Sequence, residues 1–505
     1  MNRSAWIAKA QNESFDVCII GGGITGAGIL AHAIQRGWKT LLIDKQDFAS
    51  GTSSRSSKMI HGGLRYLKMM KLGMVYEALH EREHLFRTYP GLVKPLPFIM
   101  PVYHSSFFLA VMALFIRLYG KLAGRSVLSR SQKLAAEEVG KYLPGINHNK
   151  LKGGILYWDG WVNDALLAIQ SIKESYQKGA VVLNYCEAKK FVYQDGLVQS
   201  MECTDNTDGQ NFSVNAQVYI NATGVWTDEV LERASGKHQP VMKPSKGVHV
   251  MVPAAKIPSD YVALVQSGAD DKRYVYSFPW EHGLTVLGTT DTEYSGNPEK
   301  AVAQQDDINY LFNSFNKNFP SAKLTINDIV GVYTGLRPML DDNHNKGSYL
   351  RSREYRIWWS SSNFLNIAGG KLTSFLSMGK KCMDVTEKCL NRKNIPDVDV
   401  HSNKSEVIHE DYYKEENASD EILINGFNLT GAEIMHHIRF TFAQELSDVL
   451  TRRTSITYAM KNFDENGVRK VAEIMAEALA KNSEWADMQV AKYRRHWEEY
   501  HPDFL

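Results

Sequence analysis

A glycine-rich segment near the N-terminus constrains the fold of this chain more than any other feature. Gly21, Gly23 and Gly26 form a Gly-x-Gly-x-x-Gly motif. The motif follows an apolar run rich in β-branched residues, 15–20, and precedes a segment with helical spacing, 27–35. A strand that turns through such a motif into a helix is typical of a Rossmann-like βαβ unit, whose parallel strands are joined by a right-handed crossover.

The residues of this unit suit a dinucleotide. The first glycine makes the tight turn, the second lets the backbone approach a pyrophosphate, and the third permits close packing of the helix. The second predicted strand, 39–43, ends on Asp44, where a carboxylate can accept hydrogen bonds from the hydroxyls of an adenosine ribose. The motif does not separate FAD from NAD, and its plain alternative is a turn without a ligand.

The bulk properties exclude several other classes of protein. A chain of 505 residues is expected to form two or three domains, and its net charge of +2 gives no overall attraction to nucleic acid. The five cysteines form no Cys-x-x-Cys pair, which indicates reduced thiols and no metal site. The first ten residues lack a secretion signal, and no stretch of about 18 apolar residues occurs. We therefore expect a cytoplasmic protein.

Periodicity predicts further elements along the chain. Three prolines predict irregular structure over 95–103. The other expected elements are helices at 66–89, 161–178 and 373–390, a hairpin over 181–203, strands at 217–220, 356–359 and 364–367, several strands over 248–294, and helices over 420–505.

Five blocks of sequence carry a resemblance to a known family. They are Thr-Ser-Ser-Arg-Ser-Ser-Lys-Met-Ile-His-Gly-Gly-Leu-Arg-Tyr-Leu at 52–67, Asn-Ala-Thr-Gly at 221–224, Gly-Thr-Thr-Asp at 288–291, Gly-Leu-Arg-Pro at 335–338 and Gly-Gly-Lys-Leu-Thr at 369–373. In this order the chain resembles the FAD-dependent, quinone-linked (aerobic-type) glycerol-3-phosphate dehydrogenase family over residues 15–390. Leu-Thr-Arg-Arg-Thr at 450–454 resembles the family's helical domain more loosely.

The resemblance implies an α/β fold with three parts. A discontinuous, Rossmann-like FAD-binding domain of the D-amino-acid-oxidase-like type would comprise residues 14–90, 151–240 and 330–392. An interleaved, mixed-sheet α+β domain that binds substrate and faces the membrane would comprise 91–150 and 241–329. A polar linker at 393–419 would lead to a C-terminal helical domain at 420–505, which would serve as a cap or as the contact of a homodimer.

The resemblance also implies FAD as the cofactor and assigns the residues around it. Gly21, Gly23, Gly26 and Asp44 would hold the ADP half, with Thr223 and Gly224 approaching from a second strand. Ser53, Ser54, Lys58, His61 and Gly62 would lie along the pyrophosphate and the flavin ring. Gly370, Lys371, Leu372 and Thr373 would begin a helix at the pyrimidine edge of the flavin, where N–H groups stabilise negative charge.

The implied reaction is the oxidation of sn-glycerol 3-phosphate to dihydroxyacetone phosphate. Arg65, Tyr66, Thr290, Arg337 and Lys371 match substrate-contacting positions, and arginine and lysine suit a phosphate dianion. His249 is the candidate general base or base partner because imidazole titrates near neutrality. Arg337 and Lys371 would support catalysis electrostatically. Each residue also has a purely structural alternative. His249 could be a structural histidine, Arg337 could cap a loop, and Arg65 could be a surface charge.

Residues 107–125 combine an apolar surface with positive charge. Residues 107–116 carry no charge, and Arg117, Lys121 and Arg125 stand four residues apart. This pattern predicts a helix that lies in a membrane interface. The resemblance implies that electrons pass to a membrane quinone, so the helix would rest on the inner face of the cytoplasmic membrane. A helix buried between domains is the alternative.

Three other functions stay open at this point. The first is an oxidase of the same family that passes electrons to oxygen, although the chain shows no surplus inserted loop. The second is a flavin amino-acid oxidase, whose substrate fits a set of cations poorly. The third is a flavin-binding membrane protein without catalysis.

Overall fold

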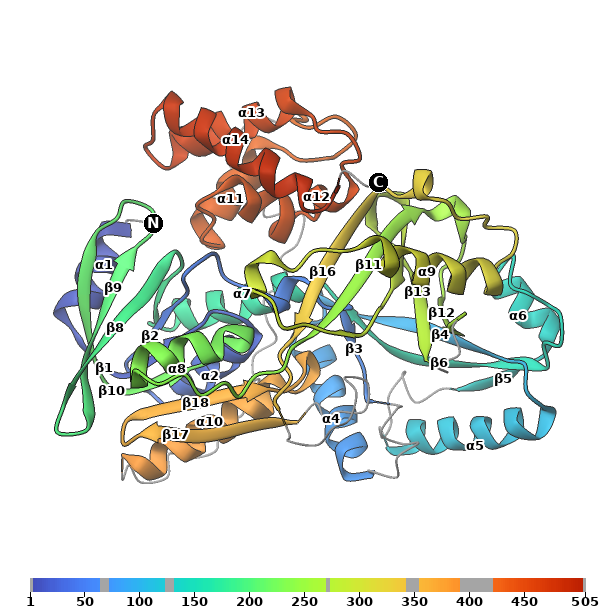
Figure 1. Cartoon of the computed structure of the whole chain (residues 1–505), viewed down its shortest axis with the longest axis horizontal. Coiled ribbons are helices and arrows are strands. Elements are labelled where there is room, and N and C mark those ends of the chain that lie inside the picture. The colour runs from blue at the N-terminus through green and yellow to red at the C-terminus, as the bar shows by residue number, and fades with distance from the viewer. Residues whose placement is uncertain are drawn as a thin grey trace.

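Two β-sheets lie side by side in this chain, and a group of C-terminal helices covers one end of both (Figure 1). The computed structural model describes residues 3–63, 72–122, 131–268, 273–341, 354–390 and 421–502. The architecture confirms the predicted class, an α/β flavoprotein-like fold with a second mixed sheet and a helical C-terminal part.

The first sheet contains the predicted βαβ unit. Its main strands, in spatial order, are β17 (Tyr355–Ser361), β18 (Phe364–Gly369), β10 (Asn211–Asn221), β1 (Ser14–Ile20), β2 (Thr40–Ile43) and β7 (Val181–Leu183). The strands from β18 to β7 run parallel, β17 runs antiparallel to β18, and the hairpin of β8 (Cys186–Gln194) and β9 (Leu197–Asp205) extends from β10. Helix α2 (Ile24–Gln35) joins β1 to β2 as predicted.

Both faces of this sheet are covered, which explains why its central strands are apolar throughout. Alternate residues of β1 enter two different cores: Val17 and Ile19 pack on one face, and Cys18 and Ile20 on the other. The covering helices are α1 (Arg3–Asn12), α2, α7 (Asp164–Gln177), α8 (Thr227–Ser235) and α10 (Phe375–Cys389).

The second sheet is larger and mostly antiparallel. Its main strands, in order, are β15 (Thr292–Glu293), β11 (Ser245–Pro253), β14 (Leu284–Gly288), β13 (Tyr274–Trp280), β12 (Val262–Gln266), β4 (Val93–Val102), β6 (Gly153–Val162) and β3 (Met59–Ile60). In addition, β16 (Gly331–Arg337) pairs with β11 and β5 (Gln132–Leu134) pairs with β6. The helices around it are α4 (Leu72–Thr88), α5 (Ser106–Leu122), α6 (Ala136–Tyr142) and α9 (Gln305–Asn318).

The strands of the second sheet come from segments that alternate with those of the first. Strands β3, β6 and β16 fall within segments that the sequence assigns to the FAD-binding domain, yet they pair in the second sheet. The division of the chain into domains by residue number therefore stays a proposal. Because the chain passes back and forth between the two sheets, the ends of both sheets lie next to one another.

The irregular structure expected for 95–103 is wrong, because β4 is a continuous strand paired with β6 over its full length. Pro95, Pro97 and Pro101 are all odd-numbered, so their missing N–H groups all face the same side of the strand. On the side away from β6, β4 pairs only at Phe98 and Ile99. The prolines therefore remove N–H groups from the edge where few are needed.

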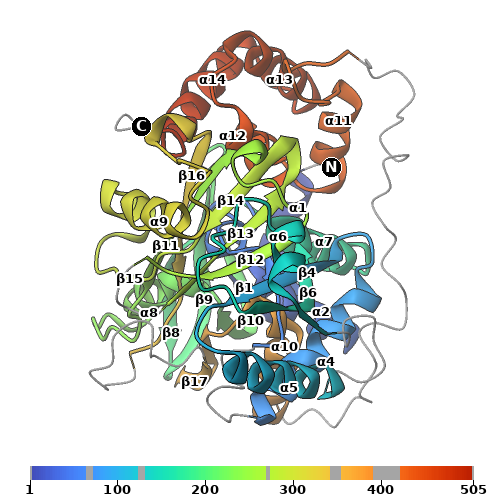
Figure 2. The same ribbon diagram turned by 90° about the vertical axis from the view of Figure 1, so that its right-hand side faces the viewer.

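The C-terminal part is helical, as predicted. It contains α11 (Gly431–Phe440), a π-helical turn at Asp448–Arg453, α12 (Ile456–Ala459), α13 (Glu465–Ala478) and α14 (Ser483–Glu498). These helices arch over the end of the two sheets (Figure 2). Within this chain they form a cap, and dimerisation through them stays a prediction. The expected linker at 393–419 lies outside the described residues.

Candidate functional site: a cofactor cleft joined to an anion cavity

The glycine motif forms the tight turn that its spacing predicts. Gly21 has a φ of 108°, and a Cβ there would lie 2.7 Å from the carbonyl oxygen of Ala222 at the end of β10. A Cβ on Gly26 would lie 1.9 Å from the carbonyl oxygen of Gly21, so α2 can pack against the turn only without a side chain here. Gly23 is the N-cap of α2 and makes no side-chain hydrogen bond to the first turn.

Asp44 lies at the end of β2, next to this turn. Its carboxylate accepts hydrogen bonds from the N–H of Gly22 at 2.7 Å and the N–H of Gln46 at 2.9 Å. Burial raises the pKa of Asp44 to about 6, although these two donors act in the opposite direction. The carboxylate is thus fixed beside the turn in the position expected of a ribose acceptor.

A cleft runs from this turn to the start of α10. Most predicted cofactor residues line it: Gly21, Gly23, Asp44, Ser53, Thr223, Gly224, Gly370, Lys371 and Leu372. The helix N-terminus with a glycine N-cap, the turn that excludes Cβ atoms and the carboxylate at the strand end together fit the pyrophosphate and ribose of a dinucleotide.

Sequence reasoning missed part of this cleft. Its wall also includes Gln46, Ser50, Gly51, Thr52, the start of β8 at 186–188, Trp226 and Arg233. The segment 45–52 follows the predicted βαβ unit directly, which is the signal that could have marked it. The hairpin residues had no such signal, because they approach only through the folding of β8 beside β2.

The serine-rich loop behind the cleft is held by buried polar contacts. The hydroxyl oxygen of Ser53 accepts a hydrogen bond from the N–H of Ile24 at 2.9 Å. Lys58 forms a buried ion pair with Asp164 and donates to the carbonyl oxygen of Ser54 at 3.1 Å. Neither Ser54 nor Lys58 lines the cleft, so both are placed to fix the loop.

The loop continues at 61–63, past the end of the cleft formed by residues 370–372. His61 lines the neighbouring cavity, and its backbone N–H donates to the hydroxyl oxygen of Thr373 at 3.3 Å. The N–H of Gly62 donates to Asp159 at 3.4 Å, and Arg82 pairs with the same carboxylate. Arg65 and Tyr66, predicted to contact substrate, lie outside the described residues.

A second cavity of about 370 Å³ opens from the cleft. The two share Thr52, Ser56, Pro338 and residues 370–372, so a ligand in the second cavity would meet the flavin end of a cofactor in the first. Its charged lining residues are Arg55, Arg273, Arg337, Lys371, Asp159 and Asp291. Because cations outnumber acids and Asp159 is already paired with Arg82, the cavity favours a small anion.

Arg337 ends β16 and is fixed in this cavity by three hydrogen bonds. It donates to the hydroxyl of Ser245 at 3.2 Å, the hydroxyl of Thr289 at 3.2 Å and the carbonyl of Thr290 at 3.0 Å. Asp291 lies 3.7 Å from the guanidinium group. The side chain of Thr290 is buried, does not line the cavity, and accepts a hydrogen bond from the N–H of Val248. Thr290 therefore supports Arg337 in this structure.

His249 lies on β11 at the wall of the same cavity. Its ring stacks on Tyr333 with centroids 4.5 Å apart, and its Nε2 lies 3.1 Å from the hydroxyl of Ser57. The hydroxyl of Tyr276 donates to Ser57, so Ser57 can donate its own proton to Nε2 when that nitrogen is unprotonated. Burial, with smaller effects of Arg337 and Lys58, lowers the pKa of His249 well below its usual 6.5. The lowered pKa favours the neutral form of this imidazole.

Lys371 lies at the junction of the cleft and the cavity. Gly369 and Gly370 precede it with φ angles of 88° and 92°, a conformation that a residue with a Cβ rarely adopts. Lys371 is the N-cap of the 3₁₀ turn Leu372–Ser374, which leads directly into α10. The backbone turn thus places a helix start and Lys371 where both spaces meet.

The fold and the cleft define an FAD-dependent oxidoreductase. The family described as FAD dependent oxidoreductase matches residues 16–376, and the C-terminal domain of alpha-glycerophosphate oxidase matches residues 402–486. FAD is therefore the cofactor, and the residues that line the cleft fit it.

Individual proteins narrow the class. The chain is 35% identical over 395 residues to the aerobic glycerol-3-phosphate dehydrogenase of Staphylococcus haemolyticus, covering 78% of this chain and 70% of the relative. It is 34% identical over 385 residues to the enzyme of the same name from Staphylococcus epidermidis, covering 76% and 69%. The chain belongs to the family of FAD-dependent glycerol-3-phosphate dehydrogenases, which confirms the predicted family and enzyme class.

Solved structures agree on the fold. The glycerol-3-phosphate dehydrogenase from Bacillus halodurans complexed with FAD has a TM-score of 0.78 at 24% identity, covering 99% of this chain and 97% of that one. The L-alpha-glycerophosphate oxidase from Mycoplasma pneumoniae with FAD bound has a TM-score of 0.59 at 18% identity, covering 78% and 98%.

Proposed function

We propose that this enzyme oxidises sn-glycerol 3-phosphate to dihydroxyacetone phosphate. The observation that carries the proposal is the small cationic cavity, with Arg337, Lys371 and the neutral His249 on its wall, joined to the cofactor cleft at residues 370–372. FAD, when bound, supplies the acceptor for the hydride that leaves C2 of the substrate.

Arg337 and Lys371 would bind the phosphate and polarise the substrate. The guanidinium group is held by the hydroxyls of Ser245 and Thr289, so its orientation needs little further ordering when a phosphate arrives. A nearby cation also stabilises the alkoxide character that develops at C2. Amino-acid oxidation is less well supported, because its substrate presents an ammonium group to a cavity in which cations outnumber acids.

Tyr276, Ser57 and His249 would remove the proton of the C2 hydroxyl. All three line the cavity, and their hydrogen bonds lead from Tyr276 through Ser57 to Nε2 of His249. Ser57 would give its proton to Nε2 and take one from Tyr276, which would take the substrate proton. Because burial lowers the pKa of His249, its ring is unprotonated at neutral pH and is a weaker base than a free imidazole.

Electrons would then pass to a membrane quinone, with α5 resting on the inner face of the cytoplasmic membrane. Leu109, Met112 and Ile116 of this helix are buried in a core that includes Phe98 and Tyr157, two apolar walls of the substrate cavity. The helix thus lies close to the reaction site. No helix in the described ranges is long and apolar enough to cross a membrane.

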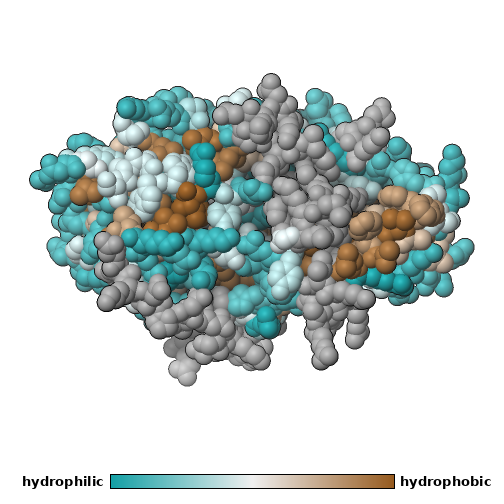
Figure 3. Space-filling view, turned by 90° about the horizontal axis from the view of Figure 1, so that it is seen from below, coloured by the Kyte–Doolittle hydropathy of each residue, from teal (hydrophilic) through white to brown (hydrophobic). Residues whose placement is uncertain are grey.

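The outward side of α5 is apolar. Phe107, Leu114 and Leu118 are 80%, 68% and 44% exposed, which contradicts a helix buried between domains. Figure 3 shows apolar surface on this lower face, in the region of α5. Arg117 is exposed beside it, whereas Arg125 lies outside the described residues. Exposed apolar side chains next to a cation suit a membrane interface that contains anionic lipid.

Anaerobic reduction tests the reaction. Millimolar glycerol 3-phosphate should bleach the flavin absorbance of the purified protein, and a soluble quinone should restore it. Absence of bleaching would contradict the proposal and would instead support a flavin-binding protein without catalysis. Rapid reoxidation by oxygen, with one hydrogen peroxide formed per substrate oxidised, would make the protein an oxidase.

Vesicle flotation tests the membrane contact. The wild-type protein should float with vesicles that contain anionic lipid, and Leu114→Glu should reduce the bound fraction several-fold. Met488→Glu is a matched control, because Met488 is 54% exposed on α14 at the other end of the molecule. Equal loss of binding in both variants would contradict a specific role of α5.

A further inference from the structure

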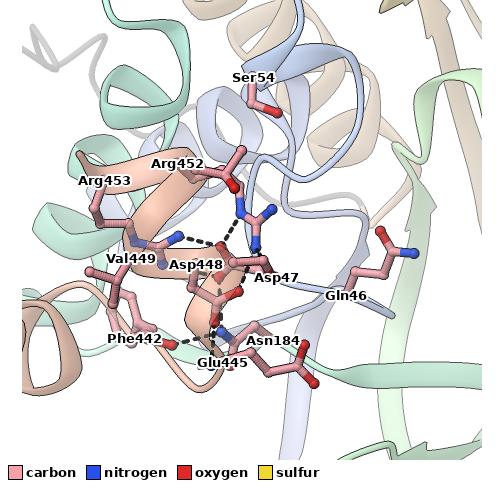
Figure 4. A network of polar contacts seen from close by, with 12 residues as sticks. Gln46, Asp47, Ser54, Asn184, Phe442, Glu445, Asp448, Val449, Arg452 and Arg453 are labelled. Carbon is pink, nitrogen blue, oxygen red and sulfur yellow. Dashed lines mark hydrogen bonds and ion pairs between the residues drawn. The ribbon is translucent and has the colours of Figure 1, made fainter. Parts of the chain in front are cut away.

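A buried carboxylate connects the cofactor loop to the C-terminal helices. Asp47 lies three residues after Asp44 and is 1% exposed. It accepts hydrogen bonds from Nε of Arg452 at 2.6 Å and from Nη2 of Arg453 at 3.0 Å, and Nη1 of Arg453 also pairs with it. Figure 4 shows both arginines converging on this carboxylate from the C-terminal part. We name these three residues the Asp47 clamp.

The charges of the Asp47 clamp are balanced where it is buried. Asp448 pairs with Arg452, so the two arginines face two carboxylates. Burial alone would raise the pKa of Asp47, but Arg453 and Arg452 outweigh it and lower that pKa below its usual value. Asn184 adds a neutral bridge, since its amide donates to Asp47 at 3.1 Å and to the carbonyl of Phe442 at 2.8 Å.

The loop that begins at Asp47 forms one wall of the cofactor cleft. Residues 50–53 line the cleft, and Ser53 accepts the N–H of Ile24 in the first turn of α2. Phe48 packs so closely under the glycine turn that a Cβ on Gly22 would lie 2.4 Å from its ring. The loop must therefore keep this conformation for the phosphate-binding turn to be complete.

The C-terminal helices hold this loop at further points on the side away from the cofactor. Phe442 meets the ring of Phe48 edge-on, with centroids 5.5 Å apart. The hydroxyl of Tyr458 donates to the carbonyl of Ser54 at 3.4 Å. Together with the Asp47 clamp, these contacts reach both ends of the loop.

The C-terminal helices also have a core of their own. A cluster of buried apolar residues that includes Leu450, Val471 and Tyr493 lies entirely within 423–493. Loss of the clamp therefore loosens the contact with the loop without removing the core that folds these helices.

We propose that the C-terminal helical domain retains FAD in the enzyme, with Arg452 and Arg453 as positioning residues that hold the cofactor loop through Asp47. A loop that has lost these contacts samples other conformations, and FAD must then order it on binding, which weakens the apparent affinity. The domain acts through protein conformation and needs no contact with FAD itself.

Flavin rebinding tests the proposal without reference to substrate. Arg453→Met should raise the Kd of the apo-protein for FAD at least about tenfold, measured by flavin fluorescence, and speed FAD release. Arg453→Lys keeps the charge but not the two-pronged contact, so it should fall between Arg453→Met and wild type. Arg494→Met removes an exposed ion pair with Glu465 in the same domain and should leave the Kd unchanged.

Two further readouts separate positioning from general destabilisation. At saturating FAD, Arg453→Met should recover the wild-type KM for glycerol 3-phosphate, and hydrogen exchange of residues 47–54 should be faster than in wild type. If Arg453→Met fails to fold, Arg453→Lys and Asn184→Ala carry the test. A Kd for FAD equal to wild type in these variants, with only the apo-protein melting temperature lowered, would overturn the proposal.

Discussion

Replacing Lys58 by methionine asks whether this lysine holds the serine-rich loop or contacts the cofactor, as its position in the family motif implies. The ammonium group and the carboxylate of Asp164 are 2% and 0% exposed. The rings of Trp280, Tyr333 and Tyr458 surround the ammonium group at 5.4 to 5.9 Å. The contacts of Lys58 are all within the protein. We therefore expect Lys58→Met to lower the stability of the fold more than it lowers the affinity for FAD.

The size of the effect follows from the partner that remains. Removing one member of a buried ion pair costs about 3–5 kcal/mol, because the other charge stays buried. Asp164 keeps the N–H groups of Ser56 and Ala165 as donors, both at 3.0 Å, and begins helix α7. A helix N-terminus favours a carboxylate by about 0.3–1 kcal/mol. We therefore expect the low end of that range, about 3 kcal/mol.

Thermal unfolding of the apo-protein measures this loss. In a cooperative unit of about 150–250 residues, a loss of about 3 kcal/mol lowers Tm by about 6–12 °C. The double variant Lys58→Met with Asp164→Asn leaves no charge buried and should return to within about 1 kcal/mol of wild type. This expectation would be refuted by an unchanged apo Tm together with a raised Kd for FAD that the added Asp164→Asn change does not restore. Lys58 would then be a residue that contacts FAD.

Three further variants test other parts of the site. Arg337→Lys should raise KM for glycerol 3-phosphate by about 10- to 100-fold in steady-state kinetics, because a charge-assisted fork is lost, and an unchanged KM would remove Arg337 from the phosphate site. Ser57→Ala should lower kcat about 100-fold with the flavin spectrum intact. In the wild type, because the pKa of His249 is lowered, kcat at saturating substrate should stay level as pH falls through 6.5 and decline only further down; a decline of kcat centred at 6.5 would exclude this base. Gly26→Ala should lose FAD on gel filtration, since its Cβ would lie 1.9 Å from the carbonyl of Gly21, and retention of FAD would show that α2 can shift.

The sequence-based prediction is limited where the role of a residue depends on its neighbours in space. The prolines of β4 were taken as breakers, although their shared parity leaves the hydrogen bonds to β6 intact. Lys58 and Thr290 stay predicted ligand-binding residues, and in the structure both side chains also make buried contacts with the protein. In each case the outcome depends on which neighbour a residue meets, and a linear pattern does not contain that information.

The group formed by Ser57, His249 and Tyr276 shows the same limit. These residues come from the serine-rich loop, β11 and β13, and only the pairing of the second sheet and the return of the loop beneath it bring their side chains together. His249 was predicted from the resemblance and from the titration of imidazole near neutrality. Ser57 lies in the serine-rich block at 52–67 but was not singled out within it. Tyr276 carried no local signal, because a tyrosine at this position fits any polar strand.

The sequence by itself determined the cofactor-binding turn. The requirements there are local: Gly21 must adopt a positive φ, Gly26 must pack against a carbonyl five residues earlier, and Asp44 must end the next strand. Residues that are close in the sequence keep a fixed spacing in the fold, so the βαβ unit and its ligand class could be predicted from the sequence. The Asp47 clamp joins residues 406 positions apart, and only tertiary structure decided that contact. Its physical reason is burial: once the C-terminal core packs against the cofactor loop, each charge there must find a partner, wherever in the chain that partner lies.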